Sequence, residues 1–183
     1  MIGDCCVCLF IKVPDEIKNL KTYTQNIESL VKNLKTGNYC FTVSYYPKDK
    51  EKEFKSWLGK DIGYMPQIGK DFCSRLKNSF LQAFSRGYKF VVIVNSEISE
   101  ITKDIAEEAL CDLEECDAVI GKTESGNIYL IGLKNNTFSP DIFVNVDWNS
   151  SESYSQLLET LQKIDYLVKE LPTPEKSKNF AEV

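Results

Sequence analysis

The sequence contains no histidine among its 183 residues. Histidine is the commonest general base in enzymes and the commonest metal ligand, because its pKa lies close to neutrality. Its absence excludes serine–histidine and cysteine–histidine hydrolase chemistry. Any reaction on this chain therefore relies on carboxylates, lysines, hydroxyl groups or a hard metal ion.

Long apolar runs and a positive charge balance are also missing. No run reaches the roughly 20 apolar residues that a membrane-spanning helix needs. The N-terminus, MIGDCCVCLFIKV, has neither a basic region nor a small-residue cleavage site, so it is a poor signal peptide and we expect a cytoplasmic protein. The net charge is −5, and an acidic surface repels phosphate backbones. We therefore expect no nucleic-acid partner and no membrane span, while the oligomeric state cannot be read from the sequence.

The seven cysteines are an odd number, which argues against a framework of disulfides. Cys5 and Cys8 have the C-x-x-C spacing of redox pairs and zinc sites. Redox pairs lie at helix N-termini, where the thiol pKa is lowered. Here the spacing falls inside the apolar run CCVCLFIKV, so we interpret these cysteines as small buried residues of a strand.

Short apolar runs alternate with amphipathic segments along the chain. Strands are predicted at residues 5–13, 39–46, 90–94, 117–121 and 128–133. Apolar residues recur at helical spacing over residues 27–34, 72–84, 101–113 and 154–164. The alternation predicts an α/β fold with a mostly parallel sheet, and the hairpin-like element at 117–133 makes one strand antiparallel.

Smaller features complete this prediction. The charged run at 48–55 indicates a solvated helix face or a loop. Ser150 or Ser151 is expected to cap the last helix. A single domain is expected over residues 1–172, followed by a loosely held tail at 173–183.

Ligands of open α/β sheets bind at the carboxyl ends of the strands. The polar candidates there are Lys12, Lys18, Lys21 and Thr22; Gln67, Gly69, Asp71 and Arg75; Asn95, Ser96 and Glu97; and Glu124, Ser125 and Asn127. Lysines and an arginine can hold a diphosphate, and a strand-end carboxylate can hold Mg²⁺ between phosphates. The alternative is the solvated rim of charge that α/β proteins usually have. Four tyrosines can stack on a base: Tyr45, Tyr46, Tyr64 and Tyr88. Residues of this kind more often lie at the edge of a hydrophobic core.

Two segments resemble a known family. Residues 67–76 fit Q-x-G-x-D-x-x-x-R, and residues 121–133 read GKTESGNIYLIGL. They are similar to Q-x-G-x-D-L-G-x-R-M and to the hairpin G-P-A-x-D-G-G-Y-Y-L-I-G-L of the DUF2064 family, small glycosyltransferase-A-like proteins of bacteria and archaea. Weaker similarities are Trp148-Asn149-Ser150 to W-S-T, and Lys12-x-Pro14 with Lys21-Thr22 to the family's opening lysines. The similarity runs in the right order from about residue 5 to about residue 172.

The resemblance implies a three-layer α/β/α fold of the glycosyltransferase-A (nucleotide-diphospho-sugar transferase) type. It implies transfer from a sugar nucleotide with Mg²⁺ or Mn²⁺, while related nucleotidyltransferases share the fold and stay an alternative. Glu97 and Glu124 are the expected catalytic carboxylates, and Glu97 and Asp147 the expected metal ligands. Asp71 would orient Arg75 or touch the base. The predicted nucleotide-binding residues are Lys12, Lys21, Thr22, Gln67, Gly69, Asp71, Arg75, Ser96, Ser125 and Gly126.

The sequence departs from the family pattern where the chemistry should be. Glu97 stands in place of the strand-end aspartate, and Ser125 in place of the hairpin aspartate. Asn127 replaces a hairpin glycine, and asparagine tolerates a positive φ. Tyr23 replaces a loop arginine, although a phenol does not reproduce an arginine fork on phosphate. The changed acids at positions 97 and 125 and the missing loop arginine favour a second hypothesis, a catalytically inactive descendant that binds a ligand or a partner.

Overall fold

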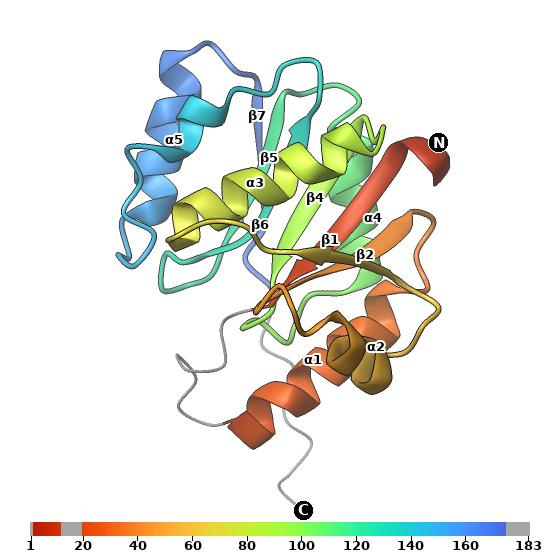
Figure 1. Cartoon of the computed structure of the whole chain (residues 1–183). Helices are drawn as coiled ribbons and strands as arrows, with labels where there is room; N and C mark the ends of the chain where they lie inside the picture. The colour runs from red at the N-terminus through yellow and green to blue at the C-terminus, as the bar shows by residue number, and fades with distance from the viewer. Residues whose placement is uncertain (1, 12–19, 175–183) are drawn as a thin grey trace, which may run out of the picture.

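The computed structural model describes residues 2–11 and 20–174, so Lys12, Lys18 and most of the expected tail lie outside it. Figure 1 shows a central sheet with helices on both faces. The strands are β1 (Cys5–Phe10), β2 (Cys40–Tyr45), β3 (Gly63–Pro66), β4 (Phe90–Asn95), β5 (Ala118–Lys122), β6 (Ile128–Lys134) and β7 (Val168–Leu171). The helices are α1 (Leu20–Leu34), α2 (Glu51–Leu58), α3 (Phe72–Ser85), α4 (Lys103–Asp112) and α5 (Ser153–Lys163), with 3₁₀ turns η1 (Ile2–Asp4) and η3 (Pro140–Phe143).

The sheet has the order β3-β2-β1-β4-β6-β5-β7. Among the described strands, β6 alone is antiparallel to its neighbours β4 and β5, and every other pairing is parallel. Because β6 runs the opposite way, its first residues lie beside the carboxyl end of β4, where Val94 pairs with Leu130. The turn before β6 is thereby brought to the edge of the sheet at which ligands of this fold class bind.

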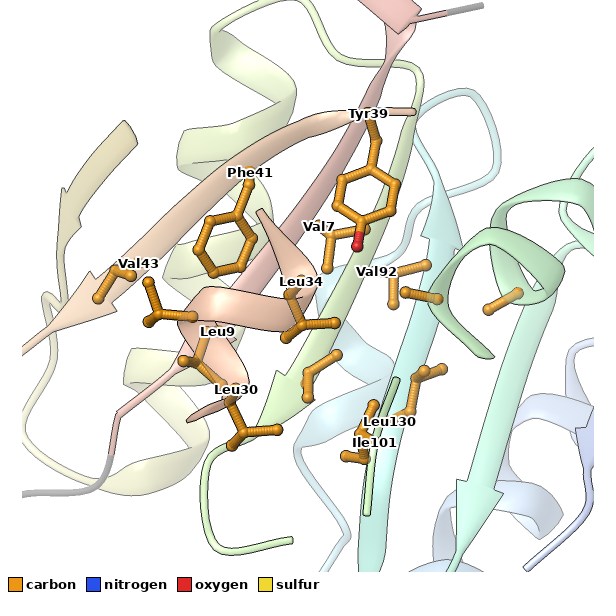
Figure 2. Close-up of a cluster of buried hydrophobic side chains, with 14 of the residues drawn as sticks. Val7, Leu9, Leu30, Leu34, Tyr39, Phe41, Val43, Val92, Ile101 and Leu130 are labelled. Atoms are coloured by element: carbon orange, nitrogen blue, oxygen red, sulfur yellow. The ribbon is translucent and has the colours of Figure 1, made fainter. Parts of the chain in front are cut away.

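Two separate cores confirm the three-layer architecture. Helices α1, α2 and α4 pack on one face of the sheet, and α3, α5 and η3 pack on the other. Successive residues of β1 alternate between the two cores, so this strand is buried on both faces. Figure 2 shows Val7 and Leu9 of β1 facing Leu30 and Leu34 of α1.

The cysteines of β1 lie within these cores, as the strand interpretation predicts. Cys5, Cys6 and Cys8 are all buried, and each thiol is free. Desolvation raises the pKa of Cys6 to about 12 and moves the pKa of Cys8 in the same direction. The buried thiolate is therefore strongly disfavoured at these positions.

Some local features were absent from the prediction or differ from it, and one decides between two predicted alternatives. Strands β3 and β7 lie at the two edges of the sheet, each is only four residues long, and β7 is interrupted by the charged Lys169 and Glu170. The charged run at 48–55 leads into and forms most of helix α2. The predicted cap of α5 is wrong, because Glu152 occupies the N-cap position and its side chain makes no cap. Ser150 Oγ instead accepts a hydrogen bond from Glu152 N (3.0 Å), which forms a turn ahead of the helix.

Within the described part of the chain, no helix is both long and apolar enough to cross a membrane.

Candidate functional site

A cleft of about 830 Å³ opens at the carboxyl ends of β1 and β4. One side, which we call the α3 wall, consists of Lys70, Asp71, Phe72 and Arg75. A second side, the β6 wall, consists of Asn127, Ile128, Trp148, Asn149 and Ser153. Asn95 and Glu97, at the end of β4, line it as well. Its volume lies in the range typical of small-molecule sites, about 300–1,000 Å³.

The α3 wall owes its shape to the start of helix α3. Asp71 is the N-cap: its carboxylate accepts a hydrogen bond from Ser74 N (2.7 Å), and Ser74 Oγ accepts one from Asp71 N (3.2 Å). The hydrogen bond from Ser74 lowers the pKa of the Asp71 carboxyl. Gly69 has a φ of +149°, and a Cβ there would lie 2.7 Å from the backbone nitrogen of Arg75. Gly69 and Asp71 thus have structural roles at this turn.

Arg75 is a buried cation on the wall of the cleft. Its exposed fraction is 9%, and its guanidinium carbon lies 5.4 Å from the centroid of the Tyr46 ring. Among the described residues, no carboxylate lies within ion-pair distance of Arg75, and its Nε has no hydrogen-bond partner. Asp71 is near enough to interact electrostatically with it. Because a buried charge without a partner is unfavourable, this guanidinium is a ready binding group for an anion.

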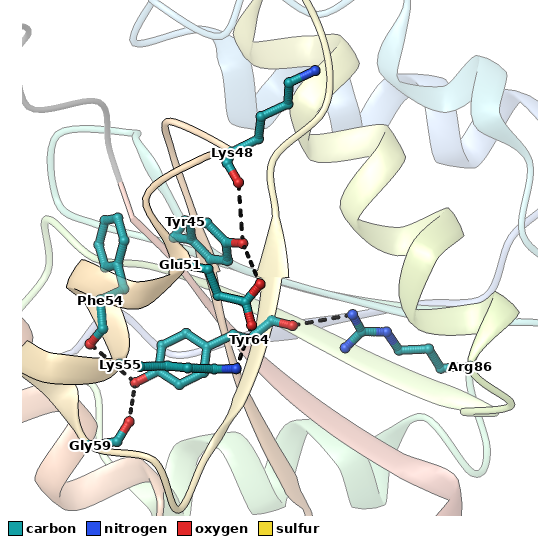
Figure 3. Close-up of polar contacts among 8 residues, drawn as sticks. All are labelled: Tyr45, Lys48, Glu51, Phe54, Lys55, Gly59, Tyr64 and Arg86. Atoms are coloured by element: carbon teal, nitrogen blue, oxygen red, sulfur yellow. Dashed lines mark hydrogen bonds and ion pairs between the residues drawn. The ribbon is translucent and has the colours of Figure 1, made fainter.

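Tyr46 follows β2 in a segment anchored by the polar contacts of Figure 3. Tyr45 OH donates hydrogen bonds at the limit of length to Lys48 O (3.5 Å) and to Glu51 Oε2 (3.4 Å). Tyr64 OH donates to Gly59 O (2.6 Å), which ties β3 to the end of α2. These contacts fix the segment whose ring covers Arg75.

Gln67 lies beneath the site, with an exposed fraction of 2%. Its Nε2 donates to Ile11 O (2.6 Å) and to Ser44 O (3.0 Å), so the side chain ties together the ends of β1 and β2. Its Oε1 has no hydrogen-bond partner among the described residues. Gln67 does not line the cleft, so its place in the structure is that of a tie between strands.

The chain after β4 contacts helix α1, on the face of the sheet opposite to α3. Glu97 is exposed on the cleft, and its backbone N–H donates to Asn95 Oδ1 (3.0 Å). The neighbouring Ser96 is fully buried, and its Oγ lies 2.5 Å from Tyr23 OH. Tyr23, the residue at the position of the family's arginine, is therefore part of the packing between α1 and β4.

The hairpin turn before β6 keeps its shape without an acid. Gly126 has a φ of +83°, and a Cβ there would lie 2.6 Å from Ser151 O, so the turn packs closely on the segment before α5. Ser125 Oγ lies 2.9 Å from Thr123 Oγ1 and accepts a hydrogen bond from Asn127 Nδ2 (3.1 Å). Asn127 is not among the residues with positive φ, so Gly126 alone supplies the left-handed conformation of this turn within the described chain.

The structure brings some of the predicted residues together and separates others. Asp71, Arg75 and Glu97 line the cleft. Asp147 is exposed, and its Oδ1 accepts a hydrogen bond from Asn149 N (3.1 Å) in a turn next to the cleft. Predicted residues outside the cleft lining are Lys21, Thr22, Gln67, Gly69, Ser96, Glu124, Ser125, Gly126 and Asp147, and Lys12 lies outside the described residues.

Several residues of the cleft are missing from the predicted site. Lys70 and Phe72 fall inside the Q-x-G-x-D segment, and Trp148 and Asn149 fall inside the segment similar to W-S-T. Those two similarities are the only signals in the sequence that could have indicated them.

The donor atoms around the cleft determine which metal ion would fit. No group of three Asp, Glu, Cys or His side chains within residues 2–11 and 20–174 could hold one. Glu97 and Asp71 are the carboxylates of the lining, and Asn95 and Asn127 add amide oxygens. Mg²⁺ commonly uses one or two protein carboxylates and completes its shell with water and phosphate. The residues therefore fit a cation that shares its coordination with a bound phosphate, but not a cage made by protein alone.

Comparison with known proteins identifies relatives of this chain. Residues 30–150 match the model of a family described as uncharacterized proteins conserved in bacteria (DUF2064). No curated protein matches the chain at a significant level. A crystal structure from Desulfovibrio desulfuricans G20, provisionally assigned as a nucleotide-diphospho-sugar transferase, has a TM-score of 0.85 and 28% identity over 93% of this chain and 80% of that one.

More distant structures share the fold. The 4-diphosphocytidyl-2C-methyl-D-erythritol synthase of Anaerococcus prevotii DSM 20548 has a TM-score of 0.61 and 13% identity, covering 97% of this chain and 94% of that chain. A CMP:2-keto-3-deoxy-manno-octonic acid synthetase complexed with CTP has a TM-score of 0.58 and 8% identity, covering 92% and 89%. The architecture is thus that of nucleotide-diphospho-sugar transferases and related nucleotidyltransferases.

Proposed function

The chain belongs to the DUF2064 family, and from this premise we propose that it is a metal-dependent transferase that uses a sugar nucleotide. The observation that carries the proposal is Arg75, a buried guanidinium without a carboxylate partner among the described residues, on the wall of the cleft. Similarity to the Desulfovibrio structure, assigned to nucleotide-diphospho-sugar transfer, supports it.

In the proposed reaction an acceptor hydroxyl attacks the anomeric carbon of the sugar and gives its proton to solvent, and the bond to the diphosphate oxygen breaks. The leaving nucleoside diphosphate takes the electron pair, so negative charge develops on its oxygens. Arg75 would bind those oxygens through its guanidinium N–H groups, with Lys70 adding positive potential. Stabilisation of charge that develops in the transition state is usually the largest single catalytic contribution.

A divalent cation, Mg²⁺ or Mn²⁺, would neutralise part of the diphosphate charge when bound. Glu97 would hold it, because this carboxylate lies at the end of β4 and lines the cleft. Asn95 keeps the end of β4 in place through its bond to the Glu97 backbone (3.0 Å). Lys12 and Lys21 remain predicted phosphate ligands. Glu124 and Asp147 remain the predicted candidates for a second carboxylate on the cation.

A thermal-shift panel tests the proposal. The panel contains UDP-glucose, GDP-mannose and CTP, each with Mn²⁺ or with EDTA. At 100-fold excess over Kd, a ligand stabilises the native state by about 2.7 kcal/mol, which is a shift of several degrees. We expect a sugar nucleotide to raise the melting temperature with Mn²⁺ and not with EDTA. A panel without any shift contradicts the proposal, and a response to CTP alone points to nucleotidyl transfer.

One observation favours the second hypothesis, an inactive descendant that binds a ligand without turnover. Ser125 replaces the hairpin acid, and its hydroxyl bonds within its own turn. A protein of this kind would bind its ligand equally well with Mn²⁺ and with EDTA, and Glu97→Ala would leave that affinity unchanged. An affinity that depends on Mn²⁺ and disappears in Glu97→Ala rejects this hypothesis.

A further inference from the structure

The two walls of the cleft differ in charge. The α3 wall carries Lys70, Asp71 and Arg75. None of the described lining residues from β6 or from the segment 148–153 is charged. An anionic ligand group is therefore favoured on the α3 wall, and a neutral one on the β6 wall.

Trp148 forms an aromatic surface in the β6 wall. Its Nε1 donates to Phe143 O (3.4 Å), and its ring lies 5.6 Å from the Phe72 ring and 6.0 Å from the Phe143 ring between centroids. The ring is half-buried and lines the cleft. Because these contacts hold the indole in one orientation, it offers a preorganised apolar surface to a ligand.

Two amides lie beside this surface. Asn149 is exposed, its backbone N–H is held by Asp147 Oδ1 (3.1 Å), and its side chain has no hydrogen-bond partner among the described residues. Asn127 donates Nδ2 to Ser125 Oγ (3.1 Å), which leaves Oδ1 as an acceptor. The close approach of Gly126 to Ser151 O joins the hairpin turn to the segment that carries Trp148. An amide offers donors and an acceptor together, as paired hydroxyl groups require.

We propose that the β6 wall binds the neutral sugar of a sugar nucleotide whose diphosphate lies on the α3 wall. This assignment rests on the proposed function and adds the class of sugar and the residues that contact it. Trp148 covers the apolar C–H face of the ring, and Asn127 and Asn149 bind its hydroxyl groups. A uronic or otherwise acidic sugar is disfavoured, because its carboxylate would lose water without gaining a cation.

Tryptophan fluorescence gives a direct test, because the chain has two tryptophans and one of them lies outside the cleft lining. That residue, Trp57, is on α2 and donates a hydrogen bond to Glu28 (2.6 Å). The Trp57→Phe variant leaves Trp148 as the reporter. It is titrated in Mn²⁺ with UDP, UDP-glucose and UDP-glucuronate, and with GDP and GDP-mannose. We expect the emission of Trp148 to change with the neutral sugar nucleotide and much less with the bare diphosphate or with UDP-glucuronate.

The affinities of two variants for the same ligands are measured by calorimetric titration instead of fluorescence. Asn149→Ala and Trp148→Leu should each lower the affinity for the neutral sugar nucleotide by about tenfold. The affinity for the bare nucleoside diphosphate should stay within about twofold of wild type. Asn149 is exposed, so its variant stays informative even if Trp148→Leu fails to fold.

The outcomes separate the two proposals. Equal changes of Trp148 emission with bare and sugar-bearing nucleotides overturn the sugar assignment and place the base on this ring. Equal loss of both ligands in the two variants also overturns it, while the proposed function stands. If neither nucleotide series binds the wild-type protein, the proposed function fails and the sugar assignment fails with it.

Discussion

The α3 wall and the β6 wall of the cleft have retained different parts of the same family pattern. In the segment that leads into α3, Gln67, Gly69, Asp71 and Arg75 match the family pattern, but Gly69 and Asp71 serve the backbone, as a close approach and a helix cap. In the hairpin turn next to the β6 wall, Gly126 is present, and Ser125 stands where the family has an aspartate. Retention of a motif therefore does not by itself indicate chemistry, because part of it is needed for folding. Arg75 is the retained residue whose burial the fold does not explain, and it is thus the one that indicates a ligand.

The largest effect that separates the walls should come from Arg75. Arg75→Met should weaken binding of UDP-glucose or another nucleoside-diphosphate sugar by about 100-fold, since a charge-assisted fork to phosphate is lost. The free protein should be as stable as wild type or more so, because an unpaired buried charge is removed. Calorimetric titration and chemical denaturation measure the two quantities.

Arg86→Met is the matched control for that experiment. Arg86 donates a hydrogen bond to Tyr64 O (3.2 Å), so its loss should lower stability and leave binding unchanged. An Arg75→Met protein that is much less stable but binds normally would show that Arg75 is a structural residue.

The turn of the β6 wall is tested by a pair of glycines. Gly126→Ala should lower the free energy of unfolding by about 3 kcal/mol, because it adds a clash with Ser151 O to the strain of a positive φ. Gly87 has a φ of +95° with no atom within 4 Å of its added Cβ, so Gly87→Ala should cost about 1–2 kcal/mol from strain alone. Urea denaturation of both variants measures the difference. Equal losses would mean that the hairpin turn is not packed against the segment before α5.

A smaller effect, on metal dependence, should separate the end of β4 from the hairpin. Glu97→Gln should weaken binding of a sugar nucleotide in Mn²⁺ by about tenfold and leave the affinity in EDTA unchanged. Glu124→Gln, in the exposed hairpin turn, tests the predicted second carboxylate and should weaken binding in Mn²⁺ less than Glu97→Gln does. The reverse order in calorimetric titrations would locate the metal at the hairpin.

The contact beneath Glu97 should have a smaller effect on stability. Tyr23→Phe removes the hydrogen bond between Tyr23 OH and Ser96 Oγ (2.5 Å) and should cost about 1 kcal/mol of unfolding free energy. Ser96→Ala removes the same bond, so the double variant should lose less than the sum of the single losses. Additive losses in denaturation experiments would mean that the two hydroxyl groups act independently.

The smallest expected effect concerns the pH dependence of the α3 wall. The hydrogen bond from Ser74 lowers the folded-state pKa of Asp71 below the ordinary value of 3.8. Its contribution to stability is therefore complete above pH 3.8 and is lost as the pH falls through the lower folded-state pKa. Asp71→Asn keeps a capping oxygen and should remove this pH dependence with little loss of stability at pH 7. A pH profile of melting temperature identical to that of wild type would contradict it.

The fold was largely predictable because its central strands leave a clear pattern. Strand β1 reads as one apolar run because both of its faces are buried. Strands β3 and β7 escaped prediction because edge strands of four residues bury few side chains, and β7 includes the exposed Lys169 and Glu170. The cap expected at Ser150 or Ser151 failed because Ser150 Oγ accepts from Glu152 N in a turn that precedes the helix, whose N-cap residue is Glu152.

The candidate site was predictable on one wall only. Arg75 follows from a local motif in which residue spacing fixes the start of a helix. Trp148 lies at the cleft in contact with Phe72, and the hairpin turn packs on Ser151; both are contacts between segments far apart in sequence. Gln67 shows a contact that residue spacing does not reveal, since its Nε2 donates to the backbone of β2 and of the residue after β1; its role toward a ligand stays a prediction.

A crystal soaked with Mn²⁺ and a mixture of sugar nucleotides would test the central proposal most directly. The account predicts diphosphate oxygens within hydrogen-bond distance of the Arg75 guanidinium, Mn²⁺ between those oxygens and Glu97, and the sugar against Trp148. Density for a nucleotide elsewhere on the molecule, with Arg75 still free of any anion, would contradict it.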